Sequence, residues 1–332
     1  MRINVQRYFA RLFVVNGYIP KIMLAALIGF VTGLVAIAFH EILLWVIHWV
    51  RIPWTGDSPL PFWSFVLVPP LGGLICGLVI YVLTKTPEAA GQGTDNMIYS
   101  FHHQGGKIRK RVAPVKFISS IITLGSGGSA GYEGPISQIG SGIASVISSL
   151  FKMPRSLRGQ FTLAGTAAGL GAIFKAPLAG ALTSVEVLYK EDFESSAFAT
   201  SIVAAVVSFT VYTAWIGLEP TFPGMPNFSF INGRELFFCA LLGVFCVPFS
   251  FLYVWAYNEA EKRFARLEIP IFLKPAIGGL FVGLLFLAYP EITGGGFGFI
   301  SEMILNQKTV AGFGILILIA VAIAKIIGTA FT

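Results

Sequence analysis

The stretch Gly125-Ser-Gly-Gly-Ser-Ala-Gly-Tyr-Glu-Gly-Pro-Ile-Ser-Gln-Ile-Gly140 joins a loop rich in glycine and serine to the start of an apolar segment. Glycine adopts the tight turns that such a loop needs, and proline is favoured at the first position of a helix. We therefore expect a helix that begins at Pro135, with Glu133 and Gly134 at its entrance. The unpaired amides of a helix start, together with the positive end of the helix dipole, attract an anion.

The rest of the chain has the composition of a membrane protein. Of the 332 residues, 55% are hydrophobic and 12% are charged, whereas a soluble domain carries about 25% charged residues. Several apolar runs reach the roughly 20 residues that a helix needs to cross a bilayer. Helices are predicted over the ranges 22–50, 63–83, 112–124, 135–151, 157–174, 177–189, 197–217, 236–257, 270–289 and 310–330.

Two of the predicted helices, 135–151 and 177–189, are short for a membrane span and are punctuated by glycine or proline. Helices that stop inside a bilayer are tolerated only where their ends line a polar cavity or are buried in protein. The sequence therefore predicts an all-α, multi-pass membrane protein with short, broken helices.

Glu133 is the strongest candidate for a functional side chain. A carboxylate inside a membrane is costly and usually functional, and this one lies beside amides that would otherwise hold an anion. When ionised, the carboxylate can occupy the place of the anion; when protonated, it loses that attraction and can leave. We predict that Glu133 is a gate; the alternative is an exposed acid that only stabilises the helix start.

A second broken stretch, Gly91-Gln-Gly-Thr-Asp95, can supply another helix start, which the Asp95 side chain would cap. Two helix starts that converge inside a membrane would form an anion site without a full positive charge. Such a site suits conduction, because binding must be weak enough to allow release.

The chain also resembles itself. The segment 70–78 has a counterpart in 275–284, 91–98 in 294–301, and 116–123 in 325–332. Membrane transporters are often built from weak internal repeats, although glycine-rich membrane helices can also match by chance. We expect an N-terminal segment over 1–21, a first membrane repeat over 22–217 and an incomplete second repeat over 218–332.

Gly131-Tyr-Glu-Gly-Pro135, followed by Gln138-Ile-Gly140, resembles the gating motif of the CLC family of chloride channels and H+/Cl- exchangers. The segments 91–93, 115–117, 168–180 and 294–297 are similar to further CLC segments. The resemblance implies two inverted-repeat halves, a pore in each subunit and a homodimer. It implies transport of chloride or similar small anions, with no cofactor, through anion-binding residues at Gly91, Gln92, Gly93, Thr94, Gly131, Tyr132, Gly134 and Pro135.

Two departures from the CLC pattern bear on mechanism. Gln92 stands where the family usually has a serine, and its longer amide, which can still donate hydrogen bonds, should alter selectivity or rate. Val187 stands where exchangers commonly carry a proton-transfer glutamate, and valine cannot relay a proton. This favours passive conduction, with proton-coupled exchange as the alternative; neighbouring Glu186 is interpreted as a buried structural acid.

An enzymatic function is one alternative, because Gly127-Gly-Ser-Ala-Gly131 matches the pattern of hydrolase nucleophile elbows. That pattern requires a strand before the serine and a general base nearby. The segment before Ser129 is predicted to be a membrane helix and the sequence offers it no obvious histidine partner, so an intramembrane hydrolase remains a remote alternative to a transport protein. His102-His103 is read as part of a solvated loop, and no metal site is predicted.

The formal net charge of +7 does not point to nucleic acid, because the basic residues flank apolar spans. By the positive-inside rule they predict a cytoplasmic N-terminus and a cytoplasmic loop at 107–116 in a cell or inner membrane. The segment 1–21 is predicted to be a basic amphipathic helix on the membrane surface rather than a cleaved signal peptide. Three cysteines in predicted spans are treated as packing residues: Cys76, Cys239 and Cys246.

Overall fold

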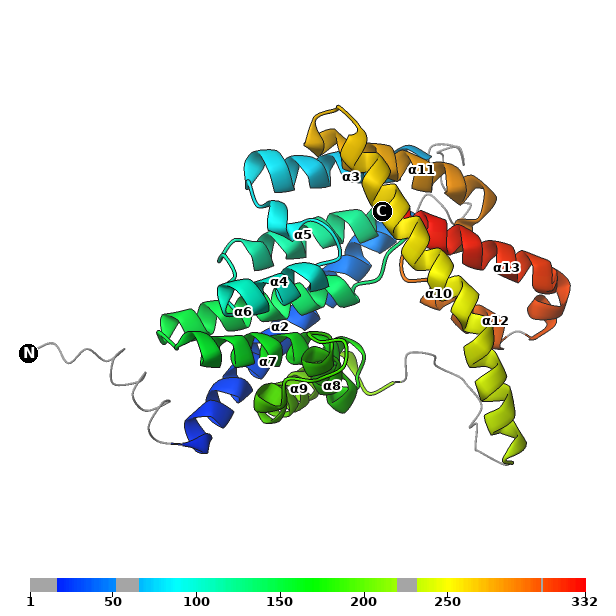
Figure 1. Ribbon diagram of the computed structural model, residues 1–332. Helices are drawn as coiled ribbons and strands as arrows, with labels where there is room; N and C mark the ends of the chain where they lie inside the picture. Colours follow the sequence, from blue (N-terminus) through cyan, green and yellow to red (C-terminus); the bar gives the residue numbers. More distant parts are fainter. Residues whose placement is uncertain (1–16, 52–65, 220–231, 306) are drawn as a thin grey trace, which may run out of the picture. The chain divides into compact units, whose positions relative to one another are not determined.

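The computed structural model describes residues 17–51, 66–219, 232–305 and 307–332, and these contain helices and no strand (Figure 1). The predicted surface helix over 1–21 therefore lies almost wholly outside the described residues. The α-helices are α2 (Tyr18–Arg51), α3 (Val68–Gly77), α4 (Thr94–Gln104), α5 (Val112–Gly125), α6 (Glu133–Leu150), α7 (Arg155–Ile173), α8 (Pro177–Glu186), α9 (Ser195–Ile216), α10 (Arg234–Arg266), α11 (Lys274–Ala288), α12 (Phe297–Leu305) and α13 (Gln307–Phe331).

Hydropathy and length make four of the described helices candidate membrane spans: Tyr18–Val50, Ser195–Ile216, Arg234–Arg266 and Ile271–Ala288. Other apolar helices, such as α5 with 14 residues, are shorter than the bilayer requires. The predicted all-α membrane fold with short, broken helices is confirmed.

Several details of the predicted helices were wrong. Of α4 only the start was predicted, because the helix is largely polar, and α12, which directly follows three glycines, was not predicted. His102 and His103 therefore lie in the last turn of α4 rather than in a loop. The apolar run after Val68 is not one α-helix, since it continues from Leu78 to Leu83 as a π-helix. Two of the cysteines, Cys239 and Cys246, are exposed on α10 rather than packed inside the protein.

The chain folds into two compact units whose segments alternate along the sequence. The first unit comprises Met1–Val46, Val79–Ile121 and Tyr132–Leu218, and the second comprises Ile47–Leu78, Ile122–Gly131 and Glu219–Thr332. The division into repeats over 22–217 and 218–332 concerns sequence similarity rather than these units, and stays a prediction.

Small residues let the helices of the first unit approach closely, as is common in membranes. The helices α6 and α7 run side by side (Figure 1), and they touch at two facing glycines. A Cβ atom on Gly140 would lie 2.1 Å from the carbonyl oxygen of Gly165, and one on Gly165 would lie 2.2 Å from that of Gly140. No side chain larger than hydrogen fits at either position without moving a helix.

We expect Gly140→Ala to destabilise the protein, because the added methyl group meets backbone rather than a movable side chain. Overpacking of this kind costs about 1–3 kcal/mol, and thermal unfolding in detergent would record a lower melting temperature. Gly243→Ala in α10 is the matched control, since nothing lies within 4 Å of its Cβ position. The close-packing account is wrong if the two variants melt at the same temperature.

Within the second unit, α3 and α11 pack through the segments that the internal repeat pairs. A Cβ atom on Gly73 would lie 2.2 Å from the carbonyl oxygen of Pro275, and one on Gly279 would lie 2.4 Å from that of Pro69. Each helix therefore presents a glycine to the first turn of the other. This reciprocal contact is what two copies of one packing motif produce.

The same local structure follows the two repeated segments, 70–78 and 275–284. A 3-10 turn at Pro87–Ala89 leads through a glycine loop into α4, and a 3-10 turn at Pro290–Ile292 leads through a glycine loop into α12. The predicted repeat thus recurs in the backbone as well as in the sequence.

Candidate anion-binding site

The loop 91–93 lies directly against the first turn of α6, and both belong to the first unit. A Cβ atom on Gly134 would lie 2.2 Å from the carbonyl oxygen of Gln92, and one on Gly93 would lie 2.9 Å from that of Gly134. Gly93, with a φ of +98°, is also the N-cap of α4. The starts of α4 and α6 therefore meet, and glycines on both sides make that approach possible.

The start of α6 differs from the predicted one by two residues. The helix begins at Glu133, with Tyr132 as its N-cap, so that Pro135 is its third residue. Proline is tolerated anywhere in a first turn, because the N–H groups there have no partner within the helix. Pro135 contributes no N–H, which leaves the amides of Glu133 and Gly134 as the donors of this turn.

The predicted cap at Asp95 is wrong. The N-cap of α4 is Gly93, no side chain caps it by a hydrogen bond, and Asp95 lies in the first turn with its side chain exposed. A glycine with positive φ fits this turn better than a residue with a Cβ atom. The Asp95 carboxylate still lies close to the positive end of the helix dipole.

Glu133 is half-buried rather than fully exposed, and it is the first residue of α6. Its backbone carbonyl accepts a 2.7 Å hydrogen bond from the Ser137 hydroxyl. The predicted gate therefore lies in the same helical turn as the amides that it would guard.

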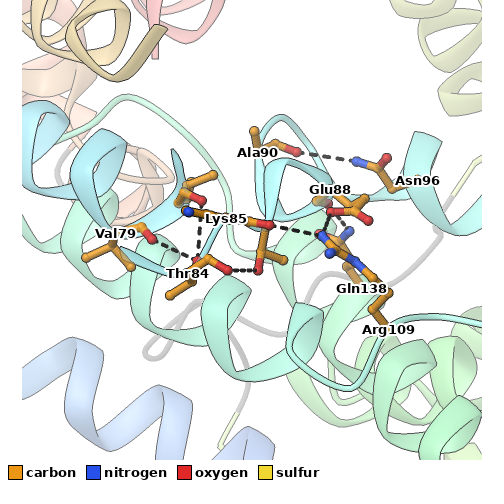
Figure 2. A network of polar contacts seen from close by, with 10 residues as sticks. Val79, Thr84, Lys85, Glu88, Ala90, Asn96, Arg109 and Gln138 are labelled. Atoms are coloured by element: carbon orange, nitrogen blue, oxygen red, sulfur yellow. Dashed lines mark hydrogen bonds and ion pairs between the residues drawn. The ribbon is translucent and has the colours of Figure 1, made fainter. Parts of the chain in front are cut away.

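Side chains from three helices or loops hold the carbonyls that precede this loop (Figure 2). The Gln138 Nε2 atom donates to the Glu88 carbonyl at 2.6 Å, and the Asn96 Nδ2 atom donates to that of Ala90 at 3.4 Å. Arg109 donates to the Lys85 carbonyl at 3.3 Å and forms an ion pair with the Glu88 carboxylate. The backbone between 85 and 90 is thus fixed from outside.

Gln138 is the buried member of this network, with 1% of its surface exposed. Its Oε1 atom has no hydrogen-bond partner among the described residues, and a Cβ atom on Gly93 would lie 3.0 Å from it. The sequence analysis noted Gln138 only as part of a motif. An amide side chain in a predicted membrane helix, where the cost of burial requires hydrogen-bond partners, was the signal that could have identified it.

Comparison with known proteins now adds to this geometry. The profile of the family described as Voltage gated chloride channel matches residues 72–332. The chain belongs to this family, the CLC family. It is 30% identical to chloride channel protein CLC-e of Arabidopsis thaliana over 328 residues, which are 92% of this chain and 45% of that protein. It is 32% identical to the H(+)/Cl(-) exchange transporter ClcA of Citrobacter koseri over 313 residues, covering 91% of this chain and 64% of ClcA.

The fold agrees with this membership. A crystal structure of a slow cyanobacterial Cl-/H+ antiporter superimposes with a TM-score of 0.77, covering 93% of this chain and 74% of that one at 22% identity. The inverted-repeat CLC architecture is therefore confirmed. The chain spans between about half and two thirds of the length of the two relatives named above.

Most of the anion-binding residues that the CLC resemblance implies gather in the first unit, and Gly131 belongs to the second. Gln92 is exposed, Thr94 is half-buried, and Gly91 adopts a φ of +70° that favours glycine. The loop and the helix start touch through Gln92, Gly93 and Gly134. Their roles as anion ligands stay predictions.

At the end of α8, Glu186 is the last helical residue and Val187 is its C-cap. Both side chains are exposed in this chain, so the interpretation of Glu186 as a buried acid is wrong. A turn follows the helix, in which the Tyr189 N–H donates to the Glu186 carbonyl at 3.2 Å. The match of Val187 to the proton-transfer position of CLC exchangers stays a prediction.

The hydrolase reading of Ser129 does not fit the local structure. The helix α5, rather than a strand, precedes the serine, and the Ser129 side chain is fully buried. Two histidines have other partners: His40 Nδ1 lies 3.0 Å from the Tyr212 hydroxyl, and His102 Nε2 lies 3.1 Å from the Leu188 carbonyl. The described residues hold no cluster of potential metal ligands.

Proposed function

We propose that this protein transports chloride, or a similar small anion, across a membrane through the site where α4 and α6 begin. The close contact between Gly134 and Gln92 carries the proposal, because it brings the starts of α4 and α6, where backbone amides lack helical partners, next to each other. Amides and helix dipoles bind an anion without a directly coordinating full charge, which keeps binding weak enough for release.

In this proposal the ligands are the loop from Gly91 to Thr94 and the turn that contains Gly131, Tyr132, Gly134 and Pro135. Gln92 can add its side-chain amide, which is exposed and can reach an anion that a shorter side chain would not. Pro135 acts by shape alone, since it has no N–H to donate. Glu133 competes with the anion as a gate: its carboxylate displaces the anion when ionised and yields to it when protonated.

The proposal can be tested with the purified protein in liposomes loaded with chloride. We expect chloride to leave these liposomes when a potassium ionophore balances the charge, and protein-free liposomes to retain it. Failure of an active, folded preparation to release chloride or any halide would contradict the proposal. The homodimer that the CLC resemblance implies, and the cytoplasmic position of the N-terminus and of the loop 107–116, are part of the same proposal.

Two modes of transport are compatible with this site. Val187 supports passive conduction, because no carboxylate at that position accepts protons from the inner side. Exchange of chloride for protons is at least as well supported by the relatives, since ClcA of Citrobacter koseri is named an exchange transporter.

Proton movement distinguishes the modes. We expect no uptake of protons when an outward chloride gradient is imposed on liposomes that contain the protein, as a pH-sensitive dye inside them would record. ClcA of Citrobacter koseri, measured in the same liposomes, provides the comparison for coupled exchange. Sustained uptake against a proton gradient would establish exchange and exclude passive conduction.

A further inference from the structure

A buried lysine lies behind the loop of the anion site. Lys116 belongs to α5 and has 4% of its surface exposed. Its Nζ atom donates to the carbonyl of Ala89 at 3.3 Å and to that of Gly91 at a shorter distance. A buried charge is costly unless it is well hydrogen bonded, so Lys116 and these carbonyls hold one another in place.

These contacts determine how the loop presents its amides. In a planar trans peptide, the carbonyl of one residue and the N–H of the next point in opposite directions. Because Lys116 holds the Gly91 carbonyl, the N–H of Gln92 points away from Lys116. The Glu88 and Ala90 carbonyls are held in the same way by Gln138 and Asn96.

We infer that Lys116 is a positioning residue for the anion site: it keeps the carbonyls of Ala89 and Gly91 off the anion and turns the amide of Gln92 towards it. This inference rests on the proposed function, because it assigns a role to a residue that supports the proposed ligands.

The second repeat contains a matched contact. Lys325 in α13 donates to the carbonyl of Ile292 at 2.8 Å and to that of Gly294 at a shorter distance. Each lysine thus binds the last residue of a 3-10 turn and the residue two positions later. At Gly296, the counterpart of Gly93, a Cβ atom would have only the Lys325 Cε atom as a neighbour, at 3.9 Å, whereas one on Gly93 would lie 2.9 Å from the Gly134 carbonyl oxygen. The loop 91–93, which Lys116 holds, therefore packs against the start of α6. Among the described residues, the loop that Lys325 holds shows no such contact with a helix start.

Because Lys116 and Lys325 make matching contacts, a variant of one can serve as the control for a variant of the other. We expect Lys116→Met to raise the chloride dissociation constant of the purified protein roughly tenfold, the loss expected for a hydrogen bond to a charged group. Isothermal titration with chloride measures that constant. Lys325→Met removes the same kind of contact, and we expect the dissociation constant to stay within about twofold of wild type. Lys116→Arg, which keeps the charge and the donors, should restore most of the affinity.

The inference is wrong if Lys116→Met binds chloride as wild type does, or if Lys325→Met weakens binding equally. Should Lys116→Met fail to fold, Gln138→Met removes the donor to the Glu88 carbonyl and should weaken chloride binding in the same direction; unchanged binding would then overturn the inference. A wild-type protein that binds no chloride or other halide contradicts the proposed function instead, so the two failures are distinguishable.

Discussion

Replacing Glu133 with glutamine should make anion flux independent of pH. The wild-type carboxylate is expected to block the site in its ionised form and to release it when protonated, so that flux rises as the pH falls. Glutamine has the size and hydrogen-bonding groups of the protonated acid but cannot ionise. The variant should therefore conduct at neutral pH at the rate that the wild type reaches only in acid. Chloride efflux from liposomes, measured across a series of external pH values, would record this change.

Asp95→Asn is the matched control for Glu133→Gln. Both acids lie in the first turn of a helix at the candidate site, but Asp95 is exposed whereas Glu133 is half-buried. We expect the Asp95 variant to keep the pH dependence of the wild type. If flux through Glu133→Gln remained as pH-dependent as before, the gate would have to be another group. If both variants lost the dependence, a general effect of negative charge at the helix starts would replace a specific gate.

Those features of the site that depend on local backbone chemistry could be predicted from the sequence. Two helix starts were indicated by the glycines at 91, 93 and 134 and the proline at 135. These residues have strong conformational preferences that act over a few positions. The error of two residues at the start of α6 has the same origin, since proline fits any position in a first turn. Asp95 was given a capping role that the glycine before it already fills.

The contacts that hold the loop could not be predicted in this way. The partners of Lys116 lie 27 and 25 residues before it, and the partner of Gln138 lies 50 residues before it. None of these three separations leaves a periodic signal in one sequence. The sequence does place a charged side chain, Lys116, and an amide side chain, Gln138, inside predicted membrane helices. The cost of burying such groups indicates that each has a hydrogen-bond partner.

The site is thus held from two sides. Donors from α4, α5 and α6 fix the carbonyls that lead into the loop, and the glycine contact fixes the distance of the loop from the start of α6. A site built from backbone amides needs both constraints, because an amide binds an anion only when its direction and its neighbours are fixed in advance.

Gly134→Ala should therefore abolish most anion binding. The new Cβ atom would lie 2.2 Å from the carbonyl oxygen of Gln92, closer than any non-bonded contact allows, so the loop or the helix start must move. The loop cannot move freely, because Lys116 holds the neighbouring carbonyl of Gly91. Overpacking against backbone costs about 1–3 kcal/mol, which corresponds to roughly a 5- to 150-fold loss of chloride affinity if the loop is displaced from its binding position.

Gly298→Ala separates this effect from the general consequence of adding a methyl group. Gly298 is the second residue of α12, as Gly134 is the second residue of α6, but nothing lies within 4 Å of its Cβ position. We expect that variant to bind chloride with wild-type affinity and to remain as stable. Titration of both variants with chloride, beside their thermal unfolding, measures affinity and stability separately. A folded Gly134→Ala protein with wild-type affinity would mean that the meeting of the two helix starts does not form the anion site.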